Sequence, residues 1–182
     1  PQLTSVEAMN VTSSANVTID FLGGASVVDI VSSGATGTVA LNNIATTAAE
    51  ITVKNTDQNH TVDYIASAVS GTADAATITL YNVTGGVLSV DTGIETLTLS
   101  STGGANATGT TTIGANSLIL TGTENITLGG TITTAETITA TAASGKVTLT
   151  SNNVNDTTIT TGAGVDAITI TGGSAVTETV SL

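Results

Sequence analysis

The sequence lacks cysteine, tryptophan and arginine, and its only aromatic residues are Phe21, Tyr64 and Tyr81. Without cysteine the chain must be stabilised by packing rather than by disulfides, although this absence does not fix a cellular compartment. A core with so few rings must be filled by Val, Ile, Leu and Ala. Threonine, which occupies 41 positions, is the polar residue that best tolerates the outer face of a strand. The composition therefore predicts an all-β protein.

Basic residues are equally scarce, because two lysines stand against fourteen Asp and Glu residues and the formal net charge is −12. A nucleic acid partner is not expected, since the chain has no basic stripe that would release its counterions. Divalent cations are the natural counterions of such a chain. No run of eighteen apolar residues occurs, so we also expect no membrane insertion.

The chain starts at Pro1, without an initiating Met or a signal peptide, and we expect it to be a segment cut from a larger protein. Residues 1–73 form a less regular, β-rich part, and residues 74–182 form a more repetitive part. Both parts are expected to belong to one continuous domain. Within the first part, the polar stretch that ends at His60 is interpreted as a solvated loop.

A short unit recurs from Asp74 onward, in which a polar or acidic residue precedes an alternation of apolar residues and threonine. Such even spacing of short alternating segments is typical of stacked strands. The anchors of the last six units are 12, 10, 10, 10 and 12 residues apart. The nine units begin at Asp74, Glu95, Asn116, Glu124, Glu136, Lys146, Asp156, Asp166 and Glu178.

One strand for every ten residues is compatible with two architectures. A parallel β-solenoid would stack equivalent strands, and the anchors Glu95, Glu124 and Asp156 suggest a three-sided coil of about thirty residues. An antiparallel β-sandwich needs the same density of strands and turns. We favour the solenoid, because the strand units resemble one another and because Thr, Asn and Gly at corners can form ladders between coils. The sandwich stays open as the alternative.

The run from Thr161 to Thr169 fits the pattern Gly-Gly-x-Gly-x-Asp-x-apolar-x at Gly162, Gly164, Asp166 and Ile168. Glycines allow a tight turn to point carbonyl oxygens inward, and an aspartate adds the charge that suits a hard cation. These residues therefore predict a Ca²⁺ site at Gly162, Gly164 and Asp166, joined by Asp156 from the preceding turn. For the other acidic residues, a role as solvated turn residues is the simpler interpretation.

No constellation for catalysis is apparent in the sequence, and we expect a protein that is not an enzyme and holds no catalytic residue. His60 is the only histidine, and the nucleophile pattern Gly-x-Ser-x-Gly is absent. An enzyme acting on polysaccharides would need carboxylates clustered with Lys54 or His60. Seven Asn-x-Thr triplets permit N-glycosylation without demonstrating it, because threonine is so abundant.

These features together resemble bacterial surface-layer proteins of the RTX, type I-secreted class. The likeness rests on the Thr, Ala and Gly content, the near absence of basic residues, strand units such as the one from Gly93 to Ser101, and the motif from Thr161 to Thr169. It implies a right-handed parallel β-helix, export through a signal outside this segment and calcium-dependent assembly of a lattice on the cell surface. Tandem copies of the motif are missing.

The sequence thus leads to two functional hypotheses. The first is a structural segment of an extracellular surface layer, whose partners are copies of itself in a lattice or fibre and, through another domain, cell-surface polysaccharide. The alternative is a repeat module of an RTX adhesin or extracellular filament that binds a surface or a glycan.

Overall fold

The computed structural model describes residues 6–21, 27–153, 157–172 and 178–181. The protein is all-β, with 56% strand and 2% helix, and its parallel sheets form a right-handed β-solenoid of about 7 turns. The elements are β1 (Val6–Val11), β2 (Val17–Asp20), β3 (Val27–Ser33), β4 (Val39–Ile44), β5 (Glu50–Thr56), β6 (His60–Tyr64), η1 (Ala66–Ala68), β7 (Ala75–Val83), β8 (Val87–Val90), β9 (Thr96–Thr102), β10 (Asn106–Thr108), β11 (Thr110–Thr112), β12 (Ser117–Gly122), β13 (Ile126–Leu128), β14 (Thr137–Ala143), β15 (Val147–Ser151), β16 (Thr157–Thr160), β17 (Ala167–Ile170) and β18 (Glu178–Ser181).

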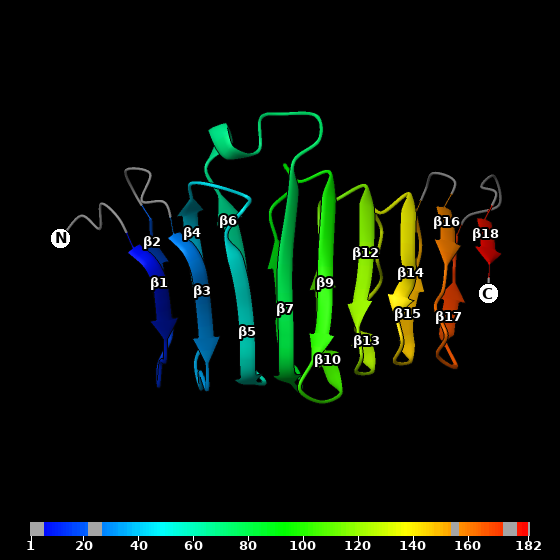
Figure 1. The fold of residues 1–182 in the computed structure, drawn as a ribbon, viewed down its shortest axis with the longest axis horizontal. Coiled ribbons are helices and arrows are strands. Elements are labelled where there is room, and N and C mark those ends of the chain that lie inside the picture. Colours follow the sequence, from blue (N-terminus) through cyan, green and yellow to red (C-terminus); the bar gives the residue numbers. More distant parts are fainter. Residues whose placement is uncertain (1–5, 22–26, 154–156, 173–177, 182) are drawn as a thin grey trace.

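The strands form two layers that face each other across the core (Figure 1). One layer is a nine-stranded sheet in the order β1-β3-β5-β7-β9-β12-β14-β16-β18. The other layer consists of a five-stranded sheet, β11-β8-β6-β4-β2, and a four-stranded sheet, β10-β13-β15-β17. All pairings are parallel, so the predicted solenoid is confirmed and the sandwich alternative is wrong. The first described strand, β1, and the last, β18, lie at opposite ends of the long axis (Figure 1).

A coil of this solenoid is about 21 residues long, because Ala75 pairs with Thr96 and Thr96 pairs with Ser117. The predicted three-sided coil of about thirty residues is therefore wrong. A strand begins within two residues of each of the nine anchors. The first three, Asp74, Glu95 and Asn116, all mark strands of the nine-stranded sheet, and from Asn116 onward successive anchors alternate between the two layers. Stacked anchors are therefore adjacent units at first, as with Glu95 and Asn116, and two units apart later, as with Glu124 and Lys146, because β9 pairs with β12 and β13 pairs with β15.

The core is a set of aliphatic columns that run along the solenoid. In the nine-stranded sheet one column contains five buried residues in register, and each side chain packs on the equivalent side chain of the next coil. Burying a Leu or Ile side chain contributes roughly 1.5–3 kcal/mol, so the repetition of such columns holds the stack together. The members of this column are Ala76, Leu97, Leu118, Ile138 and Ile159.

One coil departs from the common length. Ile51 pairs with Ile78, 27 residues later, because the segment between β6 and β7 contains the additional turn η1. This segment projects beyond the edge of the two layers (Figure 1). Val69 anchors it by packing against the core, directly opposite the backbone of Gly93.

One corner of the solenoid requires a left-handed backbone in four consecutive coils. Gly34, Asn55, Asn82 and Gly103 follow residues that are in register, and their φ angles are 65°, 51°, 52° and 76°. Glycine and asparagine are the residues that adopt this conformation at least cost. The Nδ2 of Asn82 also donates a hydrogen bond of 3.1 Å to Oδ1 of Asn55, so the two amides form a short ladder.

This corner generates a prediction for Asn55. We expect the free energy of unfolding of the Asn55→Ala variant to be about 1–2 kcal/mol lower than that of the Asn55→Gly variant, by the usual cost of a left-handed backbone. Both changes remove the amide, but only alanine is strained at positive φ. Chemical denaturation of the two variants measures the difference. Equal stabilities would show that the left-handed conformation does not constrain this corner.

Candidate functional site

The two glycines of the predicted calcium motif lie where successive coils approach each other closely. A Cβ on Gly162 would lie 2.2 Å from the carbonyl oxygen of Ala143, and a Cβ on Gly164 would lie 2.6 Å from that of Gly145. Any side chain would therefore separate the coils. Close stacking is a sufficient physical reason for glycine at both positions.

Asp166 ties the same turn to the preceding coil. Its Oδ1 accepts a hydrogen bond of 2.8 Å from the backbone N–H of Val147, whereas its Oδ2 is buried and has no hydrogen-bond partner. A carboxylate oxygen in that position suits a cation. Asp156, the fourth residue of the predicted site, lies outside the described residues. Among the residues that are described, no three His, Asp or Glu side chains are grouped closely enough to hold a metal ion.

The bond made by Asp166 is one of a series at the coil corners, where a side-chain oxygen accepts a backbone N–H from an adjacent coil. Such bonds satisfy backbone donors that the sheet ladders leave over. Acids that precede strands therefore connect coils, in addition to facing solvent. The pairs are Asn16 with Thr38, Asn59 with Val87, Asp91 with Tyr64, Glu95 with Asp74, Asn106 with Val83, Asn125 with Lys146 and Asp166 with Val147.

Asn106 is the most deeply buried member of this series, with 1% of its surface exposed. Its Nδ2 donates to Oγ of Ser101 at 2.8 Å and to the carbonyl oxygens of Thr102 and Gly104 at 3.1 and 2.8 Å. Since this nitrogen is the atom that N-glycosylation modifies, the folded chain does not present Asn106 as an acceptor.

Two carboxyl groups are stacked at the C-terminal ends of β6 and β8, two neighbouring interior strands of the five-stranded sheet. Asp63 and Asp91 follow the paired residues Val62 and Val90 in adjacent coils, and their side chains are within hydrogen-bonding reach of each other. Desolvation raises the pKa of Asp63, the charge of Asp91 and the bond to it raise that pKa further, and the backbone N–H of Asn43 opposes the shift. Two like charges at this spacing repel each other, so a proton or a bound cation would reduce the repulsion between the two carboxylates.

The stacked pair predicts an unusual pH dependence. Because the pKa of Asp63 is higher in the folded chain than in the unfolded chain, its ionisation costs stability at neutral pH, and this cost disappears as the pH falls through the folded pKa. We expect Asp63→Asn to raise the melting temperature at neutral pH and to flatten its change toward acid. Thermal unfolding across this range is the test, with Asp57→Asn at an exposed site as the control. A lower melting temperature for the Asp63 variant at neutral pH would contradict the interpretation.

His60 does not lie in a solvated loop, as the sequence suggested, but begins β6 with only 2% of its surface exposed. Its Nδ1 lies 3.0 Å from the carbonyl oxygen of Gln58, which can only accept, so Nδ1 carries the proton. Its Nε2 then accepts the hydrogen bond from Oγ of Ser32, at 2.9 Å. Desolvation lowers the pKa of His60, and the bond to Gln58 opposes this effect. Since Ser32 is fully buried, the pair stabilises the interior and presents no nucleophile.

This buried pair gives a prediction for Ser32→Ala. The substitution leaves Nε2 of His60 without a donor, and we expect it to cost roughly 1–3 kcal/mol of unfolding free energy. Ser33→Ala, on the other face of β3, is the matched control and should change little. Denaturant unfolding near neutral pH measures both variants. Equal effects of the two substitutions on the free energy of unfolding would contradict a stabilising hydrogen bond from the Ser32 hydroxyl to His60.

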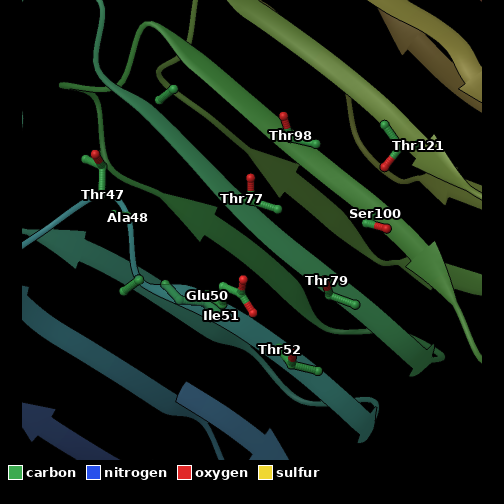
Figure 2. Close-up of a pocket in the computed structure, with 12 residues that line it drawn as sticks. Thr47, Ala48, Glu50, Ile51, Thr52, Thr77, Thr79, Thr98, Ser100 and Thr121 are labelled. Carbon is green, nitrogen blue, oxygen red and sulfur yellow. The ribbon is translucent and has the colours of Figure 1, made fainter. Parts of the chain in front are cut away.

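A shallow groove of about 480 Å³ lies on the outer face of the nine-stranded sheet. Figure 2 shows that the side chains of its floor stand on the same side of adjacent strands. Hydroxyls and small methyl groups dominate the surface, and Glu50 contributes the one charge. The lining residues from the strands are Glu50, Ile51, Thr52, Ala75, Thr77, Thr79, Thr98, Ser100 and Thr121, and Thr47, Ala48 and Ala49 close one side.

Sequence reasoning missed both this groove and the stacked carboxylates, because each depends on which residues are adjacent across coils. The alternation of threonine within single strands was the available signal for the groove. Lys54, which had no assigned role, lies with its Nζ 4.5 Å from the ring centre of Tyr81 on the same sheet.

Comparison of the chain with protein-family models, with curated proteins and with solved structures found no match. In the described part of the chain, no helix is long and apolar enough to span a membrane.

Proposed function

We propose that this chain is a structural segment of a secreted, self-assembling cell-surface protein of the S-layer type. In this role it acts through its surface, by placing the same chemical groups at a fixed spacing along the molecule for contact with further copies. Its location would be extracellular. The alternative function, an adhesin or filament module that binds a surface or a glycan, stays a prediction.

The observation that carries the proposal is the stacking of like groups in columns from coil to coil. In the parallel register, equivalent positions of successive coils lie about 4.8 Å apart along the solenoid axis. Columns of carboxylates and amides at the corners thus form periodic surfaces, which suit a lattice better than a single small ligand. Asp63 and Asp91 are the clearest such carboxylates, and Asn43 donates a side-chain hydrogen bond of 2.7 Å to Asp20 in the same column.

Charge makes calcium part of this proposal. Copies that each carry a formal charge of −12 repel one another, so close association requires that carboxylates be neutralised or bridged. Calcium binds carboxylate and carbonyl oxygens, and the unpartnered Oδ2 of Asp166 is the best-placed candidate ligand. Bridging between copies and binding within the motif both couple stability to the calcium concentration.

The test is a titration of the chain with CaCl₂ that follows melting temperature and particle size together. We expect millimolar calcium to raise the melting temperature and to produce larger particles, and MgCl₂ to do so less. Asp166→Asn should abolish the rise in melting temperature while leaving the calcium-free value unchanged, because an amide oxygen still accepts the N–H of Val147. A chain that stays monomeric with and without calcium would overturn the proposed assembly.

A further inference from the structure

We propose that the outer face of the nine-stranded sheet binds the surface of ice. The binding surface is an array of eleven Thr and Ser residues on five consecutive strands, and we refer to it as the hydroxyl array. Its members are Thr77, Thr79, Thr96, Thr98, Ser100, Ser117, Thr121, Thr137, Thr139, Thr158 and Thr160. This activity is independent of calcium and of assembly.

The first argument is the two-dimensional regularity of the array. The register places Thr77 opposite Thr98, Thr96 opposite Ser117, and Thr139 opposite Thr160. Neighbouring members are thus about 4.8 Å apart across the strands and about 6.7 Å apart along them. Both repeats are close to spacings between water oxygens on the prism face of hexagonal ice. Ala75 interrupts the first row of this lattice and Ile119 the second. The third row, Thr79, Ser100 and Thr121, ends at a register shift between β12 and β14, where Ala142 faces Thr121.

The second argument is that the hydroxyls are available. All eleven side chains are at least partly exposed, and none of their hydroxyls has a hydrogen-bond partner in the described part of the protein. Each threonine also presents a methyl group beside its hydroxyl. Because the strands are held by the ladder and by the aliphatic columns beneath, the array is ordered before it meets its partner, which lowers the entropic cost of binding.

The third argument concerns charge and size. No member of the array is charged, although the chain carries fourteen acidic residues, and Glu50, opposite Thr77 on β5, marks its boundary on that side. The array itself therefore suits an uncharged partner. The array measures roughly 19 Å by 13 Å, or on the order of 250 Å², from the strand spacing and rise. A stable protein–protein interface buries about 800 Å² on each partner, so the array alone is smaller than the contact that a stable dimer needs. An extended crystal surface needs no such area on its own side.

The experiment measures thermal hysteresis and inhibition of ice recrystallisation by the 182-residue chain without calcium. Thr98→Lys places a charge at the centre of the array and should abolish both activities. Thr148→Lys makes the same change on the four-stranded sheet and should preserve them. Ile119→Thr makes the second row an unbroken run of threonines from Thr77 to Thr160 and should increase the hysteresis. Melting temperatures of all three variants, compared with the unchanged chain, verify that each is folded.

Absence of both activities from the unchanged chain overturns the proposal. Equal loss in the Thr98 and Thr148 variants also overturns it, because the activity would then not belong to this face. If Thr98→Lys instead disrupts an oligomer and has no effect on ice growth, the face belongs to a second copy. Calcium-dependent assembly is measured separately, so failure of either proposal leaves the other intact.

Discussion

The whole structure depends on the parallel hydrogen-bond ladder between successive coils. Each coil of about 21 residues satisfies its backbone groups with the coils on either side, and most strands therefore have no exposed edge. This constraint explains the composition. Most inward positions are aliphatic, because an inward side chain packs on its counterpart in the next coil, and buried polar residues such as Ser32 and His60 are hydrogen-bonded to each other. Corners must be small or left-handed, as with Gly162 and Asn55.

Much of the fold was predictable from local pattern alone. The alternation of apolar residues and threonine located nine of the twelve described strands from Asp74 onward, and their mutual likeness favoured parallel stacking. The short strands β8, β10 and β11 were missed. The coil length was not predictable, because strands of the two layers have the same pattern and anchors such as Glu95 and Glu124 look equivalent. Only the register distinguishes them, since Glu95 precedes β9 in one layer and Glu124 precedes β13 in the other.

The candidate sites were less predictable for the same reason. The polarity of the residues around His60 indicated a loop. In the structure His60 occupies an inward-facing position of β6, and its ring is hydrogen-bonded in the core to Ser32 from the preceding coil. Asp63 and Asp91 are 28 residues apart in sequence, and the longer coil that contains η1 brings them together. Spacing within a single strand contains no information about such contacts.

The surface follows from the same stacking. A residue type that recurs at one position of the coil becomes a column, and two columns side by side become a lattice. Both proposed activities are therefore properties of periodicity, one through carboxylates that cations bridge and the other through hydroxyls that order water. Neither needs a reactive side chain, and both need the coils to be in the register described.

The most direct test of this account is the distance between nitroxide labels at Glu50 and Thr160, measured by pulsed electron resonance. Both residues belong to one column of the nine-stranded sheet, which passes through Thr77, Thr98, Ile119 and Thr139. Five strand spacings separate them, so the account predicts a narrow distribution near 24 Å, apart from the length of the labels. A broad distribution, or one centred far from this value, would contradict the stacking on which the fold and both proposals depend.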